Sequence, residues 1–204
     1  LNSNMKRLLI LFAHPKFERS RTNRALVQKV QEREGVTFHD LYEQYPDFNI
    51  DVTYEKKLLE RHDIVIWHHP FYWYSCPPLM KQWIDIVLEF GWAYGPEGVA
   101  LNGKQCLNVI TTGGSREVYC PEGTNNYSVN EFLRPFEQTA KLCGMKYLPP
   151  FAVMGTHMIS QDELDNHTHQ YDQLIHSLQN GTSFDKINDC DFLNDTPQLN
   201  NNLT

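Results

Sequence analysis

Three short segments of the chain carry the residue types that bind phosphates and flat rings. The first holds His14, Ser20 and Asn23, the second is the aromatic stretch 70–75, and the third, 111–114, ends in two glycines. Hydroxyl and amide groups at the start of a helix suit a phosphate, while aromatic side chains and closely approaching glycine backbone suit a planar ring. Together they predict a site for a flat, phosphorylated cofactor, and a flavin is our first choice.

Each segment follows an apolar run that is typical of a buried parallel strand, at 8–12, 64–67 and 106–111. Ser20 is placed to cap a following helix. In an open α/β sheet, ligands bind beyond the carboxyl ends of the strands, near the point where the strand order reverses. We therefore expect the three segments to meet at one edge of a sheet.

Strand and helix patterns alternate along the chain, which predicts an α/β fold with a doubly wound sheet of five parallel strands in the order 2-1-3-4-5. Residues 1–180 form the expected domain, and the Asn- and Asp-rich residues 181–204 are expected to be a mobile tail. The other expected strands are 36–41 and 147–154, and the expected helices lie within 20–35, 52–61, 77–91, 129–143 and 161–178.

Composition excludes several classes of function. The net charge of −7 argues against general binding to nucleic acid. The chain has no Gly-x-Gly-x-x-Gly or Gly-Lys-Ser/Thr motif, so a fixed nicotinamide dinucleotide is unsupported. The apolar run 8–13 is too short for an export signal or a membrane helix, which predicts a cytoplasmic protein. Five scattered cysteines are read as free thiols.

Histidine pairs do not predict a metal site. His68 and His69 are adjacent, and His167 and His169 are close in sequence, but neither pair has partners at zinc spacing. We expect these histidines at the surface or just behind the site, with no metal bound.

Each of the three segments also has a simpler interpretation. A capped helix with a solvated basic face explains the first, a dimer interface explains the aromatic residues 71–74, and a Gly-Gly pair often marks only a turn. Tyr119 follows the glycines by five residues and could donate a proton or a hydrogen bond to a substrate.

Taken together, the motifs resemble the flavodoxin-like NAD(P)H:quinone reductases. Within that family the chain is most similar to the ancillary oxidoreductase subunits of glutathione-gated potassium efflux systems, and the resemblance covers roughly residues 7–180. It rests on residues 14–23, the segment 69–85 (HPFYWYSCPPLMKQWID), residues 111–114, and the stretches 39–48 (HDLYEQYPDF) and 91–95 (GWAYG).

The resemblance implies a flavodoxin-like fold that binds FMN, with FAD as the alternative. It implies two-electron, ping-pong transfer of a hydride from NADH or NADPH to a quinone, an azo compound or another electrophile. It also implies a homodimer with Tyr94 near the pocket of the second subunit, and docking to a potassium/proton antiporter at the inner membrane. The implied flavin contacts are His14, Ser20, Arg21, Thr22, Asn23, Pro70, Phe71, Tyr72, Trp73, Tyr74, Thr111, Thr112, Gly113, Gly114 and Tyr119.

In related reductases a tyrosine after the Gly-Gly loop and a histidine six residues later assist proton transfer. Tyr119 matches the first position and is the candidate catalytic residue, whereas Asn125 occupies the second. Two other roles stay open. One is a regulatory subunit that activates an efflux system with incidental turnover. The other is a one-electron carrier of the flavodoxin kind, which usually has a Ser/Thr-rich loop where this chain has His14-Pro15.

Overall fold

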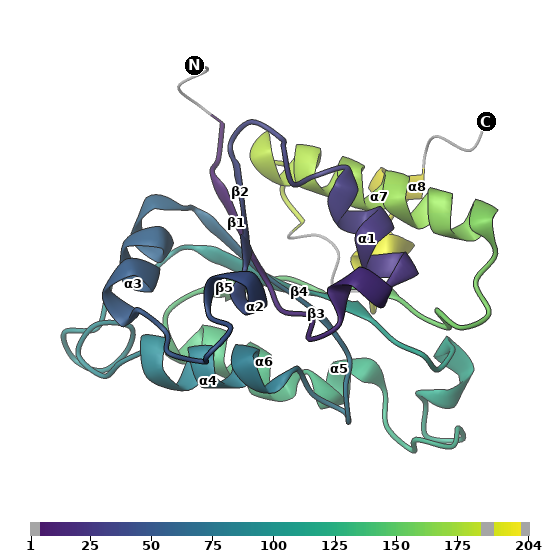
Figure 1. Ribbon diagram of the computed structural model, residues 1–204, viewed down its shortest axis with the longest axis horizontal. Helices are drawn as coiled ribbons and strands as arrows, with labels where there is room; N and C mark the ends of the chain where they lie inside the picture. The colour runs from purple at the N-terminus through teal and green to yellow at the C-terminus, as the bar shows by residue number, and fades with distance from the viewer. Residues whose placement is uncertain (1–4, 185–189, 201–204) are drawn as a thin grey trace.

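Two strands at the centre of the structure, β1 (Leu8–Phe12) and β3 (Ile64–Pro70), are buried along their whole length. A strand covered by helices on both faces has no solvent side, which is why its sequence is continuously apolar. The computed structural model describes residues 5–184 and 190–200, and its ribbon shows helices above and below a twisted sheet (Figure 1). The predicted α/β architecture is confirmed.

The strands pair in parallel in the order β2-β1-β3-β4-β5, and β6 also pairs with β4. This is the predicted order, in which the sequence of strands reverses between β1 and β3. Alternate residues of β1 face opposite sides, so Leu9 and Leu11 enter one core while Leu8 and Ile10 enter the other. The other strands of the sheet are β2 (Val36–Asp40), β4 (Gln105–Thr111), β5 (Lys146–Tyr147) and β6 (Phe151–Val153).

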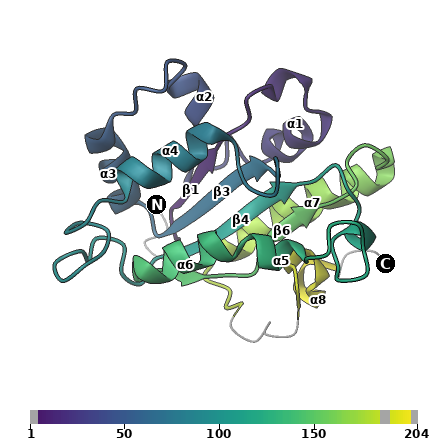
Figure 2. The ribbon, with the colours of Figure 1, turned by 90° about the horizontal axis from the view of Figure 1, so that it is seen from below.

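Helices cover both faces of the sheet. Helices α1 and α7 pack on one face, and α3, α4 and α6 pack on the other, where Figure 2 shows α4 and α6 in front of the strands. Within the described part of the chain, no helix has the length and apolar character needed to cross a membrane. The helices are α1 (Arg21–Gln28), α2 (Leu41–Gln44), α3 (Val52–Arg61), α4 (Pro78–Val87), α5 (Val129–Phe132), α6 (Arg134–Leu142), α7 (Gln161–Gln179) and α8 (Pro197–Asn200), with 3-10 turns η1 (Phe17–Arg19), η2 (Arg116–Val118) and η3 (Leu193–Asp195).

Prolines divide two of the predicted elements. The strand expected at 147–154 is instead the two short strands β5 and β6, separated at Pro149 and Pro150, because proline has no N–H for the sheet ladder. The helix expected at 129–143 is divided into α5 and α6, and Pro135 lies in the first turn of α6. A proline there needs no amide partner, so it favours a new helix start.

The C-terminal segment is packed where the structure describes it. Phe184, Leu193 and Leu199 are buried in the core on the α1 and α7 side of the sheet, and Phe192 is buried in the opposite core. The prediction of a mobile tail therefore does not hold for residues 190–199. The apolar residues of this segment are too few to give a periodic pattern in the sequence, yet they pack beside β6. Residues 185–189 and 201–204 of the predicted tail lie outside the described residues.

Strand β3 extends beyond its predicted end at Trp67 and includes two adjacent histidines. His68 and His69 are fully buried, which excludes the surface and leaves the other expected place, just behind the site. Burial lowers the pKa of His68 to about 3 and that of His69 to about 4, because each charged imidazolium would lose its hydration. Both side chains are therefore neutral in the folded protein at physiological pH.

The two neutral histidines predict acid sensitivity. As the pH falls below the ordinary histidine value of 6.5, the unfolded chain takes up protons that the folded chain does not, so stability decreases. From about pH 7.5 to about pH 5.5 we expect a loss of about 3 kcal/mol in the free energy of unfolding, measured by urea titration. The exposed control His169→Gln should keep this pH slope. A free energy of unfolding that does not change over this pH range would contradict the assignment of both histidines as neutral in the folded protein.

Candidate functional site

A cleft of about 530 Å³ lies at the carboxyl ends of β1, β3 and β4. This is the edge where the strand order reverses, and the volume is in the range of roughly 300–1,000 Å³ that is usual for small-molecule sites. All three predicted segments contribute to its wall. The lining residues are His14, Lys16, Arg19, Ser20, Arg21, Thr22, Asn23, Pro70, Phe71, Tyr72, Thr111, Gly113, Thr156 and His157.

The N-terminus of α1 forms the polar end of the cleft. The Ser20 hydroxyl accepts the backbone N–H of Asn23 at 3.2 Å, which confirms the predicted cap. The first amides of a helix have no partner within the helix and carry partial positive charge, so they bind anions well. Lys16 and Arg19 add basic side chains at the rim. This end of the cleft suits a phosphate.

A chain of buried hydrogen bonds holds that helix terminus in place. The Asn23 amide donates to Ser20 Oγ and to Thr111 Oγ1, each at 3.0 Å, and its oxygen accepts from His68 Nε2 at 3.1 Å. His68 Nδ1 in turn accepts the Tyr171 hydroxyl at 3.3 Å. A neutral imidazole satisfies both contacts. The network links α1, β3, β4 and α7 directly behind the cleft.

His14, at the end of β1, is also held in one tautomer. Its Nδ1 accepts the backbone N–H of Lys16 at 3.1 Å, and burial lowers the pKa of the imidazole below its usual value. The ring therefore keeps its proton on Nε2, where it can donate to a ligand in the cleft. The ring also lies edge-on to Tyr72, with centroids 6.0 Å apart.

The four aromatic residues after β3 point in different directions. Phe71 and Tyr72 line the cleft, whereas the side chain of Trp73 is 92% exposed. Tyr74 turns away to stack on Phe132, with centroids 5.0 Å apart. Trp73 and Tyr74 adopt φ angles of 48° and 64°, a region that costs energy for residues other than glycine. The strained turn directs two aromatic rings inward and presents Trp73 to solvent.

The Gly-Gly segment leaves no room for side chains. A Cβ atom on Gly113 would lie 2.6 Å from His157 Nε2, and one on Gly114 would lie 2.8 Å from Val118 Cγ2. Thr112 does not line the cleft, because it is buried and its hydroxyl donates to the Gly114 carbonyl. A ligand can therefore approach the backbone of Gly113 closely.

Tyr119 lies behind the aromatic wall of the cleft. Its ring packs edge-on against Phe71 and Phe132, with centroids 5.8 and 6.4 Å away, and its hydroxyl lies near Gly114. Burial raises the pKa of this hydroxyl above its ordinary value, so the group is protonated at neutral pH. Tyr119 can therefore act as a hydrogen-bond or proton donor.

The loop that follows β6 also contributes to the cleft, although none of its residues is among the predicted contacts. Thr156 and His157 complete the cleft wall, as does Lys16 after β1. The strand expected at 147–154 ends one residue beyond β6, so the rule that ligands lie beyond the carboxyl ends of strands already points to this loop. Arg21 was predicted as a cofactor contact, but its guanidinium donates to Ile159 O at 3.0 Å and to Gln161, which fixes the same loop.

The described residues contain no group of three or more His, Cys, Asp or Glu side chains arranged to hold a metal ion. The five cysteines are free thiols, as predicted.

Comparison with known proteins finds similar chains over most of the length. A family model for the flavodoxin-like fold matches residues 6–175. The glutathione-regulated potassium-efflux system ancillary protein KefG of Pectobacterium carotovorum is 43% identical over 175 residues, which cover 86% of this chain and 96% of that protein.

Two solved structures are also similar. General stress protein 14 of Treponema denticola, in complex with FMN, is 40% identical with a TM-score of 0.80, covering 85% of this chain and 99% of that chain. A protein of P. pentosaceus described as an NADPH-quinone reductase is 32% identical with a TM-score of 0.76, covering 83% of this chain and 97% of that chain.

The network around Asn23 predicts a large effect of one substitution. Asn23→Ala leaves the His68 Nε2–H without its acceptor and Thr111 Oγ1 without its donor, and both groups are buried. We therefore expect a loss of about 1–3 kcal/mol in the free energy of unfolding, measured by urea titration. Gln28→Ala, on the exposed side of the same helix, is the control and should change stability by less than about 0.5 kcal/mol. Equal stability of the two variants would mean that the network contributes little.

Proposed function

The chain belongs to the family of proteins with the flavodoxin-like fold, and we propose that it is a flavin-dependent NAD(P)H:quinone oxidoreductase that uses FMN. The observation that carries the proposal is the cleft itself, which combines a helix N-terminus, an aromatic wall and an open glycine backbone. The named relatives support it, because one is a complex with FMN and another is described as a quinone reductase.

The residues of the cleft fit FMN in chemistry and in size. Ser20, Thr22 and the first amides of α1 would hold the phosphate, and Phe71, Tyr72 and Gly113 would flank the ring. When bound, FMN supplies two-electron hydride chemistry between NAD(P)H and a quinone. The protein contributes orientation and hydrogen bonds, and the aromatic wall excludes water from one side of the site.

Two protonated groups can assist the reaction. Neutral His14 offers its Nε2–H at the polar end of the cleft, and Tyr119 offers its hydroxyl beside the Gly-Gly segment. Tyr119 does not itself line the cleft, and we propose that its hydroxyl, beside Gly114, reaches the developing anionic oxygen of the acceptor when the acceptor binds. Asn125, which stands where related reductases have a histidine, accepts a hydrogen bond from Tyr74 at 3.2 Å, and an amide cannot relay a proton in the same way.

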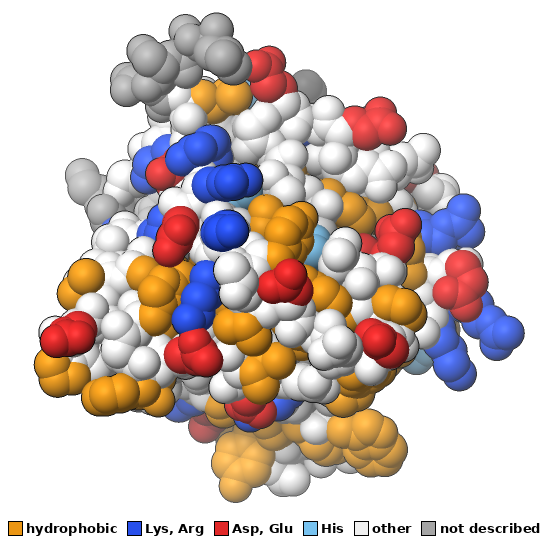
Figure 3. All heavy atoms as spheres, turned by 60° about the vertical axis from the view of Figure 1, so that its left-hand side comes forward, with side chains coloured by type: hydrophobic (Ala, Val, Ile, Leu, Met, Phe, Trp, Pro, Cys, Tyr) orange, Lys and Arg blue, Asp and Glu red, His pale blue; other side chains and the backbone are white. Residues whose placement is uncertain are grey.

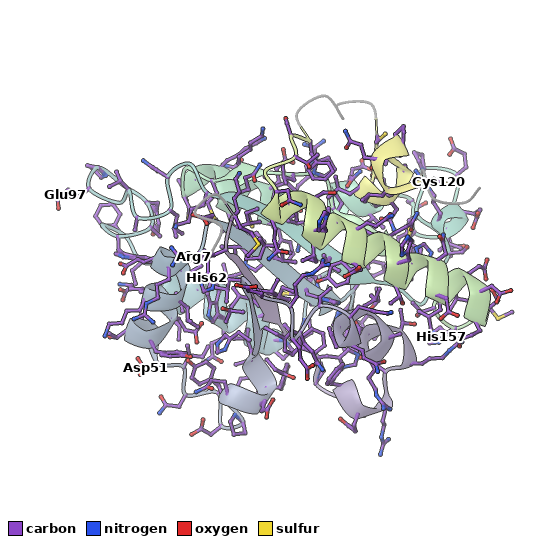
Figure 4. All side chains as sticks on the ribbon, turned by 90° about the horizontal axis from the view of Figure 1, so that it is seen from above. Arg7, Asp51, His62, Glu97, Cys120 and His157 are labelled. Atoms are coloured by element: carbon purple, nitrogen blue, oxygen red, sulfur yellow. The ribbon has the colours of Figure 1, made fainter. Side chains whose placement is uncertain are left out.

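We propose further that the protein forms a homodimer. Figure 4 shows Glu97, in the loop that follows Tyr94, at the opposite end of the molecule from His157, so Tyr94 can reach a cleft only in a second subunit. Large apolar side chains are exposed at Trp73 and Phe90, and apolar groups lie along the lower edge of the surface in Figure 3. Burying such groups favours association.

A partner at the membrane is part of the same proposal. The relative from Pectobacterium is named as an ancillary protein of a potassium-efflux system, and its similarity spans most of both chains. We propose that this chain also activates a potassium/proton antiporter, and that reductase turnover and activation use one flavin-loaded subunit. The alternative role, activation with incidental turnover, shares the same site.

The first test is the cofactor. The purified protein should have the absorption spectrum of a flavin, release FMN on denaturation, and oxidise NADH or NADPH with a quinone. Gly113→Val should weaken FMN binding at least about tenfold, because its Cβ would lie 2.6 Å from His157 Nε2 and displace a side chain of the cleft wall. His157→Ala alone is the reference for the double variant Gly113→Val/His157→Ala, in which the clash is gone and the loss of affinity relative to that reference should be smaller. A protein that binds neither flavin would overturn the proposal.

The second test concerns the proton donor. Tyr119→Phe keeps the ring contacts with Phe71 and Phe132 and removes the hydroxyl, so kcat for quinone reduction should fall about 10²-fold while FMN affinity is retained. Tyr127→Phe, an exposed tyrosine that also contacts Phe132, is the matched control. Unchanged kcat in Tyr119→Phe would remove its catalytic role. Potassium efflux supported by this variant would favour activation without turnover.

A further inference from the structure

We propose that Arg116 is a positioning residue, and that residues 190–199, here called the C-terminal strap, act through it to hold the turn that carries Tyr119. The strap lies beyond residue 175, where the match to the family model ends. Its importance for catalysis rests on the proposed function, whereas the mechanical link between strap and turn is independent of it.

The inner side of the C-terminal strap is fixed to the edge of the sheet. The N–H of Leu193 donates to the Pro150 carbonyl at 2.9 Å, and the Asn194 side-chain oxygen accepts the N–H of Ala152 at 2.8 Å. Leu193 and Thr196 are fully buried. These contacts join the strap to the residues around β6, so the strap has a fixed position at this edge of the sheet.

The outer side of the C-terminal strap holds Arg116. The guanidinium makes two contacts with Asp195, at 3.1 and 3.0 Å, and one with Asp191 at 3.3 Å. It also lies over the ring of Phe192, 5.0 Å from the centroid. Asn130 donates to the Asp191 carbonyl at 3.0 Å, which connects the strap to α5 as well. A two-point contact to one carboxylate fixes the direction of an arginine.

Arg116 and Tyr119 belong to the same turn, so fixing Arg116 also fixes Tyr119. Arg116 begins the turn η2, and its carbonyl accepts the N–H of Tyr119 at 3.1 Å. On the inner side of the same turn, Val118 and Tyr119 cover Gly114, and the Tyr119 ring contacts Phe71. An anchor on the outside of the turn therefore restricts the tyrosine on the inside.

The strength of this anchor depends on ionic strength. The side chains of Arg116, Asp191 and Asp195 are 51%, 70% and 34% exposed, so each ion pair alone is weak and is screened by salt. The ring of Phe192 and the two-point contact with Asp195 add directional contacts that a single exposed pair lacks. We therefore expect an effect on positioning that salt can reduce.

The test compares the full-length double variant Asp191→Asn/Asp195→Asn with wild type. Hydrogen–deuterium exchange at amides 115–127 should become faster, while exchange in β1 stays unchanged. The KM for the quinone should rise about three- to tenfold with little loss of bound FMN. Wild type in about 0.5 M NaCl should approach the variant, and the variant should respond less to salt. Lys141→Gln, which removes an exposed ion pair with Glu137 on α6, is the matched control.

The outcomes separate this inference from the proposed function. Unchanged hydrogen–deuterium exchange at 115–127 in the double variant would contradict the proposal that the strap holds this turn, whatever the reductase activity. Faster exchange with unchanged KM would overturn the positioning role of Arg116. Should the protein lack reductase activity, the exchange measurement still decides whether the strap holds the turn. Arg116→Lys, which keeps the charge and loses the two-point contact, should reproduce the effect and serves if the double variant fails to fold.

Discussion

One buried hydrogen-bond chain, from Tyr171 through His68 to Asn23, determines where the cleft can form. It crosses from α7 through the central strand to α1, and Asn23 then reaches Thr111 on β4. Each member is satisfied only while the others keep their places, and a buried polar group without a partner is costly. The helix terminus that suits a phosphate is therefore fixed at the reversal of strand order before any ligand arrives.

The local charge of the cleft differs from that of the whole chain. The protein carries a net charge of −7, yet Lys16, Arg19 and the amides of α1 line one end of the cleft. The helix dipole adds to these charges, because its positive end points into the same space. An acidic protein can therefore still attract an anionic ligand at one position, while its overall charge discourages non-specific binding to polyanions.

The sequence predicted the parts of the fold that depend on local patterns. Continuous apolar runs identified the central strands, and Ser20 identified the start of α1. Two predictions failed where a single residue type overrides the pattern, at Pro135 and at Pro149–Pro150. The direction in which a side chain points could not be predicted from local sequence either. Local sequence places Arg21 beside the cleft, but only the tertiary structure shows its guanidinium bound to the loop before α7.

The left-handed backbone at Trp73 and Tyr74 determines which substitutions there would raise the thermal stability of the protein. Glycine at either position would relieve about 1 kcal/mol of strain, and would also remove a ring that faces solvent or packs on Phe132. A laboratory evolution experiment that rewards heat resistance would therefore favour glycine there. One that rewards turnover or assembly would retain the aromatic residues, so the two selections should enrich different sequences at the same two codons.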